Sequence, residues 1–175
     1  VANALAAAGL ALAAGLAPEL IAERLGSVRI ESPHRMDVLE LSGDLLLIDD
    51  SYNANIDSMR AAVAALEAIG KGRRTIAVLS EMLELGEDSP ATHRAVGAML
   101  SGAGVDALIG LGRDAHYYSE GAASVPDRVL AEDPGAALAA VLDRLTDDCV
   151  VLVKGSYNSY SWQVADGLLE EATTR

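Results

Sequence analysis

Residues 45–69 read LLLIDDSYNANIDSMRAAVAALEAI and contain two kinds of hydrophobic pattern. Residues 45–48 are a short continuous apolar run, which is typical of a buried strand, whereas residues 57–69 have the pattern of a helix. A polar segment, residues 49–55, connects the two. The stretch therefore predicts a strand–loop–helix unit of an α/β fold.

The same alternation continues to the end of the chain. Further strands are predicted at 75–79, 105–109, 128–130 and 150–153, and further helices at 89–100, 115–123, 135–145 and 161–172. Upstream, an apolar run at 36–41 is separated from residue 45 by Ser-Gly-Asp, which indicates a hairpin or tight turn. Two helical patterns, 3–15 and 18–25, come first, and residues 27–33 are the candidate boundary. We expect a mostly parallel, helix-flanked sheet preceded by a helix pair.

Composition excludes several classes of protein. The 175 residues are 51% apolar and carry a formal net charge of −13, which argues against a disordered chain and against nucleic-acid binding. The single cysteine, Cys149, lies in an apolar run, and a buried free thiol fits a reducing, cytoplasmic compartment. Residues 1–16 are too short and lack the basic flank for a membrane helix, so we expect no membrane insertion. Because the chain opens directly in a helix, we expect the protein to continue upstream of Val1.

The segment after residue 48 is the strongest candidate site. Two carboxylates, a phenol and two carboxamides stand within seven positions, and a helix cap, supplied by Asn55 or Asp57, explains only one or two of them. Adjacent carboxylates at a strand end suit ribose hydroxyls or the surroundings of Mg²⁺. Asparagine side chains suit a carboxylate or amide substrate. In a parallel α/β sheet such chemistry gathers at the carboxyl ends of strands.

Lys154 is the second candidate, because it is one of only two lysines and ends an apolar strand before Gly155. It either meets an anion or extends its ammonium into solvent at the edge of the sheet. The sequence leaves both alternatives open.

A third signal is the stretch Gly110–Ala115, which matches G-x-G-x-x-A after a predicted strand, with Glu132 and Asp133 after the next one. It predicts either a dinucleotide-binding module or a tight turn between strand and helix. The short following helix and the position in mid-chain favour the turn. The three histidines show no zinc spacing, so no metal site is predicted, and no P-loop is present.

Residues 49–59, DDSYNANIDSM, resemble the Mur ligases, in particular the branch that adds D-alanyl-D-alanine to UDP-N-acetylmuramoyl tripeptide. Matches at residues 3–8, 35–38, 82–87 and 151–156 occur in the order of that family. The resemblance implies that residues 1–29 are the helical tail of the central ATPase domain and that residues 30–175 are the C-terminal Rossmann-like domain. It further implies contact with the family's N-terminal and central domains, which carry the P-loop, the Mg²⁺ ligands and the UDP-sugar site.

The resemblance also implies a reaction in which ATP, with Mg²⁺, activates the tripeptide carboxylate as an acyl phosphate that the dipeptide amine attacks. The catalytic residues of the central domain are outside this chain, so the chain alone is expected to be inactive. The residues that would bind the nucleotide are Asn3, Arg35, Asp50 and Tyr52. The residues that would bind D-Ala-D-Ala are Asn53, Asn55, Glu84, Lys154, Ser156 and Asn158. Asp50 is expected to hold the ribose hydroxyls and to contribute little to stability.

The chain departs from the family pattern at three places. Ile56 replaces a proline, Ser80-Glu81 replaces Gly-Asp, and Tyr157 stands where the family has an arginine. The last change leaves open a divergent Mur-like ligase with another amino-acid or dipeptide acceptor.

Overall fold

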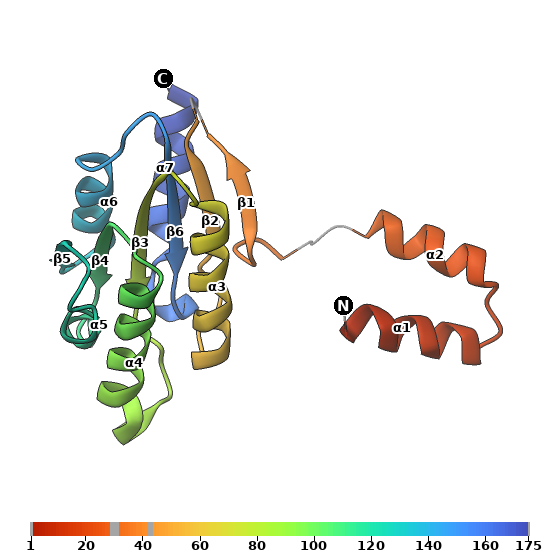
Figure 1. The fold of residues 1–175 in the computed structure, drawn as a ribbon. Helices are drawn as coiled ribbons and strands as arrows, with labels where there is room; N and C mark the ends of the chain where they lie inside the picture. Colours follow the sequence, from red (N-terminus) through yellow and green to blue (C-terminus); the bar gives the residue numbers. More distant parts are fainter. Residues whose placement is uncertain (1, 29–31, 42–43, 175) are drawn as a thin grey trace. The chain divides into compact units, whose positions relative to one another are not determined.

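A six-stranded sheet with the order β1-β2-β6-β3-β4-β5 forms the centre of the computed structural model (Figure 1), which describes residues 2–28, 32–41 and 44–174. The strands are β1 (Asp37–Glu40), β2 (Leu46–Asp50), β3 (Arg74–Ser80), β4 (Ala107–Leu111), β5 (Asp127–Ala131) and β6 (Cys149–Lys154). β1 and β2 form an antiparallel hairpin, and all other neighbouring pairs are parallel. The predicted class, a mostly parallel helix-flanked sheet, is confirmed.

Helices cover both faces of this sheet. The first face carries α3 (Ile56–Ile69), α4 (Ser89–Gly102) and α5 (Ala115–Gly121), and the second carries α6 (Pro134–Leu142) and α7 (Trp162–Thr174). Leucine, valine, isoleucine and alanine build both cores. Tyr118 is fully buried, and its hydroxyl donates to the Ser80 carbonyl. Burial, followed by the nearby carboxylates Glu81 and Asp114, raises the pKa of this phenol well above its ordinary value, so it remains a donor.

Cys149 begins β6 and is buried, as its apolar surroundings predict. Burial raises the pKa of its thiol, which favours the unreactive protonated form.

The start of β4 differs from its prediction by two residues. The apolar run suggested 105–109, but pairing with β3 begins at Ala107, opposite Ile76. The Asp106 carboxylate accepts hydrogen bonds from the backbone N–H and the hydroxyl of Thr75, so residue 106 acts as a side-chain cap before the ladder begins. The shift moves Gly110 from the predicted loop into the strand.

The chain crosses the sheet in an order that brings three strand ends together. The helices that follow β2, β3 and β4 pack on the first face, whereas those that follow β5 and β6 pack on the second. β6 returns to the middle of the sheet, between β2 and β3. In α/β folds, ligands bind where neighbouring strands send their helices to opposite faces. Three neighbouring pairs meet this condition, and two of them, β2–β6 and β6–β3, share the carboxyl end of the central strand β6; the third, β4–β5, lies at the edge of the sheet.

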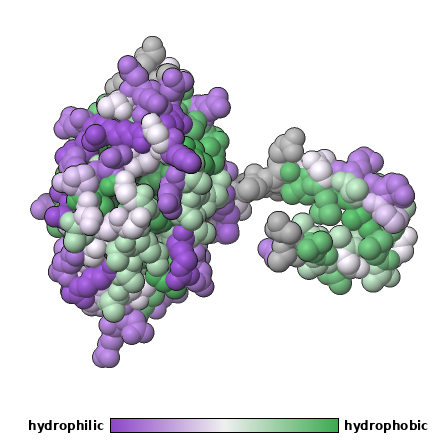
Figure 2. All heavy atoms as spheres, viewed as in Figure 1, coloured by the Kyte–Doolittle hydropathy of each residue, from purple (hydrophilic) through white to green (hydrophobic). Residues whose placement is uncertain are grey.

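Residues 1–32 form a separate compact unit from residues 33–175. The first unit contains α1 (Ala2–Ala13) and α2 (Pro18–Ser27), and Gly15 has a positive φ of 87° in the turn between them. Several of its leucines are exposed, including Leu5 at 68% and Leu10 at 75%. Figure 2 accordingly shows apolar residues on the surface of this helix pair. None of the described helices has the length and apolar character needed to cross a bilayer.

We predict opposite effects for two glycine-to-alanine changes in α4. A Cβ at Gly97 would lie 2.1 Å from the Tyr118 carbonyl oxygen of α5, so Gly97→Ala should lower the free energy of unfolding by about 1–3 kcal/mol through overpacking. Gly102 has nothing within 4 Å of such a Cβ, so Gly102→Ala should raise stability by up to about 1 kcal/mol through helix propensity. Urea unfolding of both variants measures the difference, and equal effects would contradict the close approach of α4 to α5.

Candidate functional site

Polar side chains and two cavities lie at the carboxyl ends of β2, β6 and β3. The larger cavity has a volume of about 890 Å³ and the smaller about 300 Å³. Tyr52, Asn53 and Asn55, from the loop after β2, line both cavities. This loop is therefore a wall that the two cavities share.

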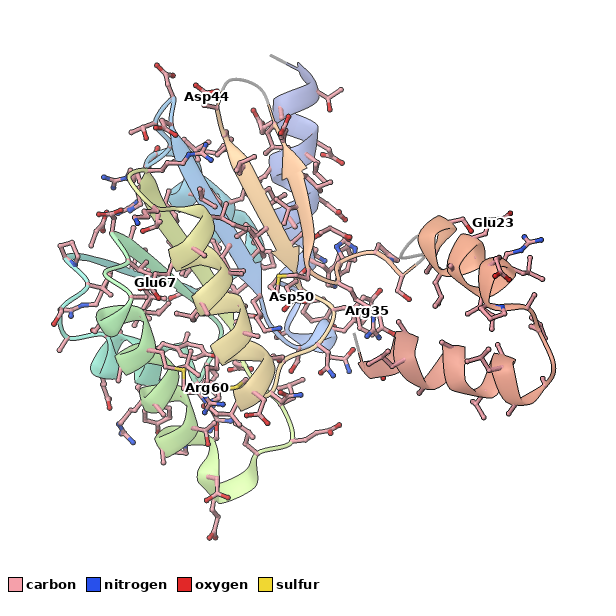
Figure 3. All side chains as sticks on the ribbon, turned by 45° about the vertical axis from the view of Figure 1, so that its right-hand side comes forward. Glu23, Arg35, Asp44, Asp50, Arg60 and Glu67 are labelled. Atoms are coloured by element: carbon pink, nitrogen blue, oxygen red, sulfur yellow. The ribbon has the colours of Figure 1, made fainter. Side chains whose placement is uncertain are left out.

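The two cavities divide the predicted site residues only in part, because three of them line both and Lys154, predicted for the dipeptide, lines the smaller one. The predicted nucleotide-binding residues Arg35, Asp50 and Tyr52 line the smaller cavity, and Figure 3 shows Arg35 and Asp50 at the same end of β1 and β2. The larger cavity is lined by predicted dipeptide-binding residues, namely Asn53, Asn55, Glu84, Ser156 and Asn158. Asn3 lies on α1 in the first unit, so its predicted contact with adenine stays a prediction.

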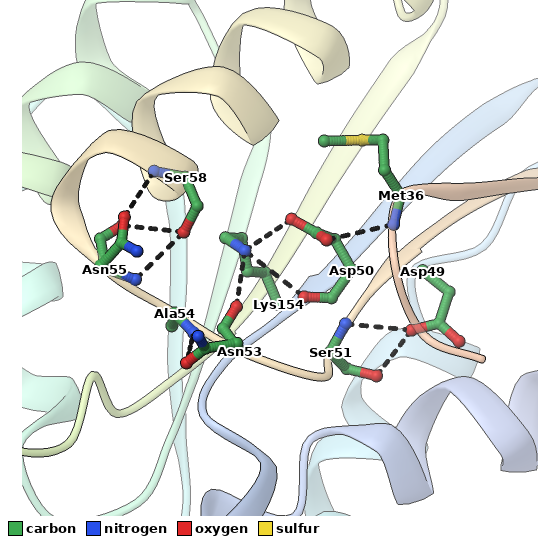
Figure 4. Close-up of polar contacts among 9 residues, drawn as sticks. All are labelled: Met36, Asp49, Asp50, Ser51, Asn53, Ala54, Asn55, Ser58 and Lys154. Atoms are coloured by element: carbon green, nitrogen blue, oxygen red, sulfur yellow. Dashed lines mark hydrogen bonds and ion pairs between the residues drawn. The ribbon is translucent and has the colours of Figure 1, made fainter. Parts of the chain in front are cut away.

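Lys154 forms a buried ion pair with Asp50 (Figure 4). Its side chain is 1% exposed, and Nζ lies 2.5 Å from Asp50 Oδ2 and 2.8 Å from the carbonyl oxygen of Asn53. The second oxygen of Asp50, Oδ1, accepts a hydrogen bond from the Met36 N–H at 3.1 Å. The alternative of a lysine at the sheet edge is wrong, because β6 is a central strand. The ammonium is held within the protein, and the role of Lys154 as the cation for the dipeptide stays a prediction.

The same contact changes the expectation for Asp50. A strand-end carboxylate was expected to contribute little to stability, but removal of Asp50 would leave a buried ammonium without its counter-charge. Such uncompensated charges are among the most costly defects in a fold.

Asn55 caps α3. Its side-chain oxygen accepts a hydrogen bond from the Ser58 N–H at 2.9 Å, and the Ser58 hydroxyl accepts one from the Asn55 N–H at 3.0 Å. This reciprocal capping box starts the helix at Ile56 without the proline of the family motif. The cap uses the Asn55 oxygen and leaves its amide N–H₂ as the group that can face a ligand.

The loop after β6 is tied to the loop after β3. Ser156 donates its N–H to the carbonyl of Glu81 at 3.1 Å, and its hydroxyl accepts the N–H of Leu83 at 3.0 Å. A Cβ at Gly155 would lie 1.6 Å from Ser80 Oγ, so only glycine fits between the strand ends. Ser156 thus has a bracing role, and its prediction as a dipeptide ligand remains a prediction.

Aromatic rings form part of the larger cavity where the resemblance would place an arginine. Tyr157 stacks on Trp162 with ring centroids 5.8 Å apart, and it also contacts Tyr52 at 5.7 Å. Arg35 lies over the ring of Tyr52, with Cζ 4.1 Å from the ring centre. Among the described residues that line the larger cavity there is no lysine or arginine.

The stretch Gly110–Ala115 is a packed turn, which does not support the dinucleotide-binding alternative. The Glu81 carboxylate accepts the Asp114 N–H at 2.7 Å, so it lies at the helix start where a pyrophosphate would bind. Asp133 caps α6 through the Ala136 N–H and is not a free ribose ligand.

One contact beside the larger cavity is not predicted from the sequence: His34, which lines the cavity, meets Asp49. His34 Nδ1 lies 2.7 Å from Asp49 Oδ2. The hairpin register pairs Asp37 with Asp49, so the predicted hairpin already contained a signal that residues just before 37 lie beside the polar loop.

Taken with this geometry, sequence comparison defines the class of protein. Residues 34–157 match the family model described as "Mur ligase, glutamate ligase domain". The chain belongs to the Mur ligase family, and the resemblance found in its motifs is confirmed.

Individual relatives narrow the class to one branch. The UDP-N-acetylmuramoyl-tripeptide--D-alanyl-D-alanine ligase of Mycobacterium leprae is 36% identical over 193 residues, which cover 100% of this chain and 37% of that protein. A crystal structure of MurF from Acinetobacter baumannii has a TM-score of 0.86 at 28% identity and covers 96% of this chain and 37% of that one. MurF from Thermotoga maritima in complex with ADP has a TM-score of 0.68 at 25% identity, with coverages of 91% and 38%. The chain thus spans little more than a third of the length of these relatives.

The buried ion pair gives a direct stability prediction. Asp50→Ala should lower the free energy of unfolding by about 3–5 kcal/mol, because Lys154 loses its counter-charge. In the double variant Asp50→Ala/Lys154→Met the loss should be smaller than the sum of the single losses. Arg60→Ala, which opens the exposed pair with Asp57, is the matched control and should cost at most about 1 kcal/mol. Additive losses in urea unfolding would contradict the pairing.

Proposed function

We propose that this chain is the C-terminal part of a cytoplasmic, ATP-dependent ligase that adds D-Ala-D-Ala to UDP-N-acetylmuramoyl tripeptide in peptidoglycan synthesis. The observation that carries the proposal is the pair of adjoining cavities with one shared loop. Arg35 and Asp50 of the predicted nucleotide site line only the smaller cavity, whereas Glu84, Ser156 and Asn158 of the predicted dipeptide site line only the larger one. The names of the relatives, and ADP in one of the similar structures, support both ligands.

Residues 1–29 would belong to the central ATPase domain and residues 30–175 to the C-terminal domain. The two compact units and the exposed leucines of α1 and α2 support this division, because such an apolar surface suits contact with the rest of a domain. The N-terminal and central domains of the same protein would then be the partners of this chain.

In this reaction ATP converts the tripeptide carboxylate into an acyl phosphate, and the dipeptide amine displaces phosphate. The chain's own residues position the two reactants, a proximity effect. Arg35 and Tyr52 would contact the nucleotide, whereas Asn53, Asn55 and Asn158 would orient the dipeptide. Lys154 would serve both sites indirectly, because it holds the Asp50 side chain and the Asn53 carbonyl.

Mg²⁺ would accompany the nucleotide phosphates. The described residues contain no group of three histidine, cysteine, aspartate or glutamate side chains suited to a metal ion, and Asp50 is paired with Lys154. The resemblance would place the metal ligands in the ATPase domain.

A divergent acceptor is the second candidate. Tyr157 and Trp162 form an aromatic wall, and none of the described residues that line the larger cavity is a lysine or arginine that would bind a terminal carboxylate. Competition between D-Ala-D-Ala and dipeptides with a larger or amidated second residue tests it. Preference for the alternatives would favour the divergent ligase.

Two substitutions in the full-length ligase should separate the two cavities. Arg35→Ala should raise the KM for ATP about tenfold, because a charged hydrogen bond contributes about 1.5–3 kcal/mol, and should leave the KM for the dipeptide nearly unchanged. Asn158→Ala should do the reverse, with a rise of about threefold to tenfold for the dipeptide. Steady-state kinetics with each substrate varied in turn measure both constants. Parallel shifts in both variants would contradict the two-cavity assignment.

The isolated 175-residue chain should fold but hydrolyse no ATP and form no peptide bond. It contains no P-loop to cradle the β- and γ-phosphates. Circular dichroism verifies the fold, and a phosphate-release assay with Mg²⁺ measures turnover. Metal-dependent ATP turnover by the pure chain would contradict the prediction.

A further inference from the structure

His34 and Asp49 form a pair of the kind that orients a histidine for proton transfer. Asp49 is 3% exposed, and Ser51 fixes its carboxylate. Its oxygen Oδ1 accepts hydrogen bonds from the Ser51 hydroxyl at 2.6 Å and the Ser51 N–H at 3.2 Å. Its other oxygen, Oδ2, lies 2.7 Å from His34 Nδ1. An ionised carboxylate only accepts hydrogen bonds, so the contact with Oδ2 assigns the ring hydrogen to Nδ1, and in that tautomer Nε2 carries the lone pair.

The ring of His34 belongs to the wall of the larger cavity. His34 is among the residues that line it, together with Asn53 and Asn158 of the predicted dipeptide site. Within the described part of the chain, Nε2 of His34 has no hydrogen-bond partner. It is also not buried, because the buried side-chain atoms without a partner are on Arg74, Ser161 and Trp162. The atom is therefore open to a ligand in the cavity.

The proposed reaction needs such a proton acceptor. At neutral pH the amino group of a dipeptide is mostly an ammonium, which has no lone pair and cannot attack a carbonyl carbon. We propose that His34, oriented by Asp49, is the catalytic base that deprotonates the incoming dipeptide ammonium. This assignment rests on the proposed function.

The step balances without any further reactant. One ammonium proton passes to His34 Nε2, and the freed lone pair forms the C–N bond at the carbonyl carbon of the acyl phosphate. The C–O bond to phosphate then breaks, and phosphate leaves with that electron pair and the second amine proton. His34 returns its proton to solvent.

Other charged and titratable groups also surround the cavity. The lining residues among them are Tyr52 in the loop after β2, Glu84 after β3, Tyr157 after β6 and Asp166 on α7, and Asp49 on β2 contacts His34 without lining the cavity. Glu84 and Asp166 would attract the ammonium. His34 is the lining residue that has a carboxylate partner and a free ring nitrogen.

The test compares two nucleophiles in the full-length ligase supplied with ATP and UDP-N-acetylmuramoyl tripeptide. Hydroxylamine is already neutral at pH 7 and traps acyl phosphates as hydroxamates without a base, whereas D-Ala-D-Ala needs one. His34→Gln should lower kcat/KM for the dipeptide about 100-fold or more and leave hydroxamate formation within about twofold of wild type. The dipeptide defect should shrink above about pH 8, where the α-amino group loses its proton unaided. His116→Gln makes the same change on α5, outside the cavity, and should leave both reactions unchanged.

Each contrary result has a distinct meaning. An equal loss of both reactions in His34→Gln, a dipeptide rate within about threefold of wild type, or a defect that does not depend on pH would overturn the assignment of His34. A wild-type protein that forms no hydroxamate would contradict the proposed function, and the base with it, because no acyl phosphate would be present.

Discussion

The buried ion pair between Lys154 and Asp50 is the constraint on which the site depends. It joins the carboxyl ends of β2 and β6, and the same ammonium holds the carbonyl of Asn53. A charge that is 1% exposed is tolerated only with such partners, so the loop after β2 must keep this path. Because that loop lines both cavities, the ion pair sets the shape of both.

A second set of contacts extends this order across the sheet. Ser156 connects the loop after β6 to the loop after β3, and Glu81 connects that loop to the start of α5. Gly155 allows the close approach between the strands. Ser156 and Lys154, which the resemblance predicts as ligand contacts, thus make hydrogen bonds within the protein that brace the site.

The two sides of the site differ in how closely they follow the family. The loop after β2 keeps the family motif from Asp49 to Asn55. Helix α3 begins at Ile56 without the proline of the motif, because Asn55 and Ser58 form a capping box. The loop after β6 departs from the family pattern, since Tyr157 stacks on Trp162 where the resemblance would place a guanidinium. The loop that both cavities share therefore keeps the family sequence, whereas aromatic rings, amides and His34 line the larger cavity.

The sequence by itself determined in which order strands and helices follow one another along the chain. It also determined the family and most of the residues around the two cavities. Those signals are local, because apolar period, turn residues and the motif 49–59 are each read within a few residues. Only the tertiary structure decided the role of Lys154, because β6 enters the sheet between β2 and β3 and places its ammonium against Asp50, 104 residues away. It likewise decided that His34 meets Asp49 and that Glu81 fills the turn at Gly112. Strand order and long-range pairing arise from packing of the whole chain, and no local pattern contains them.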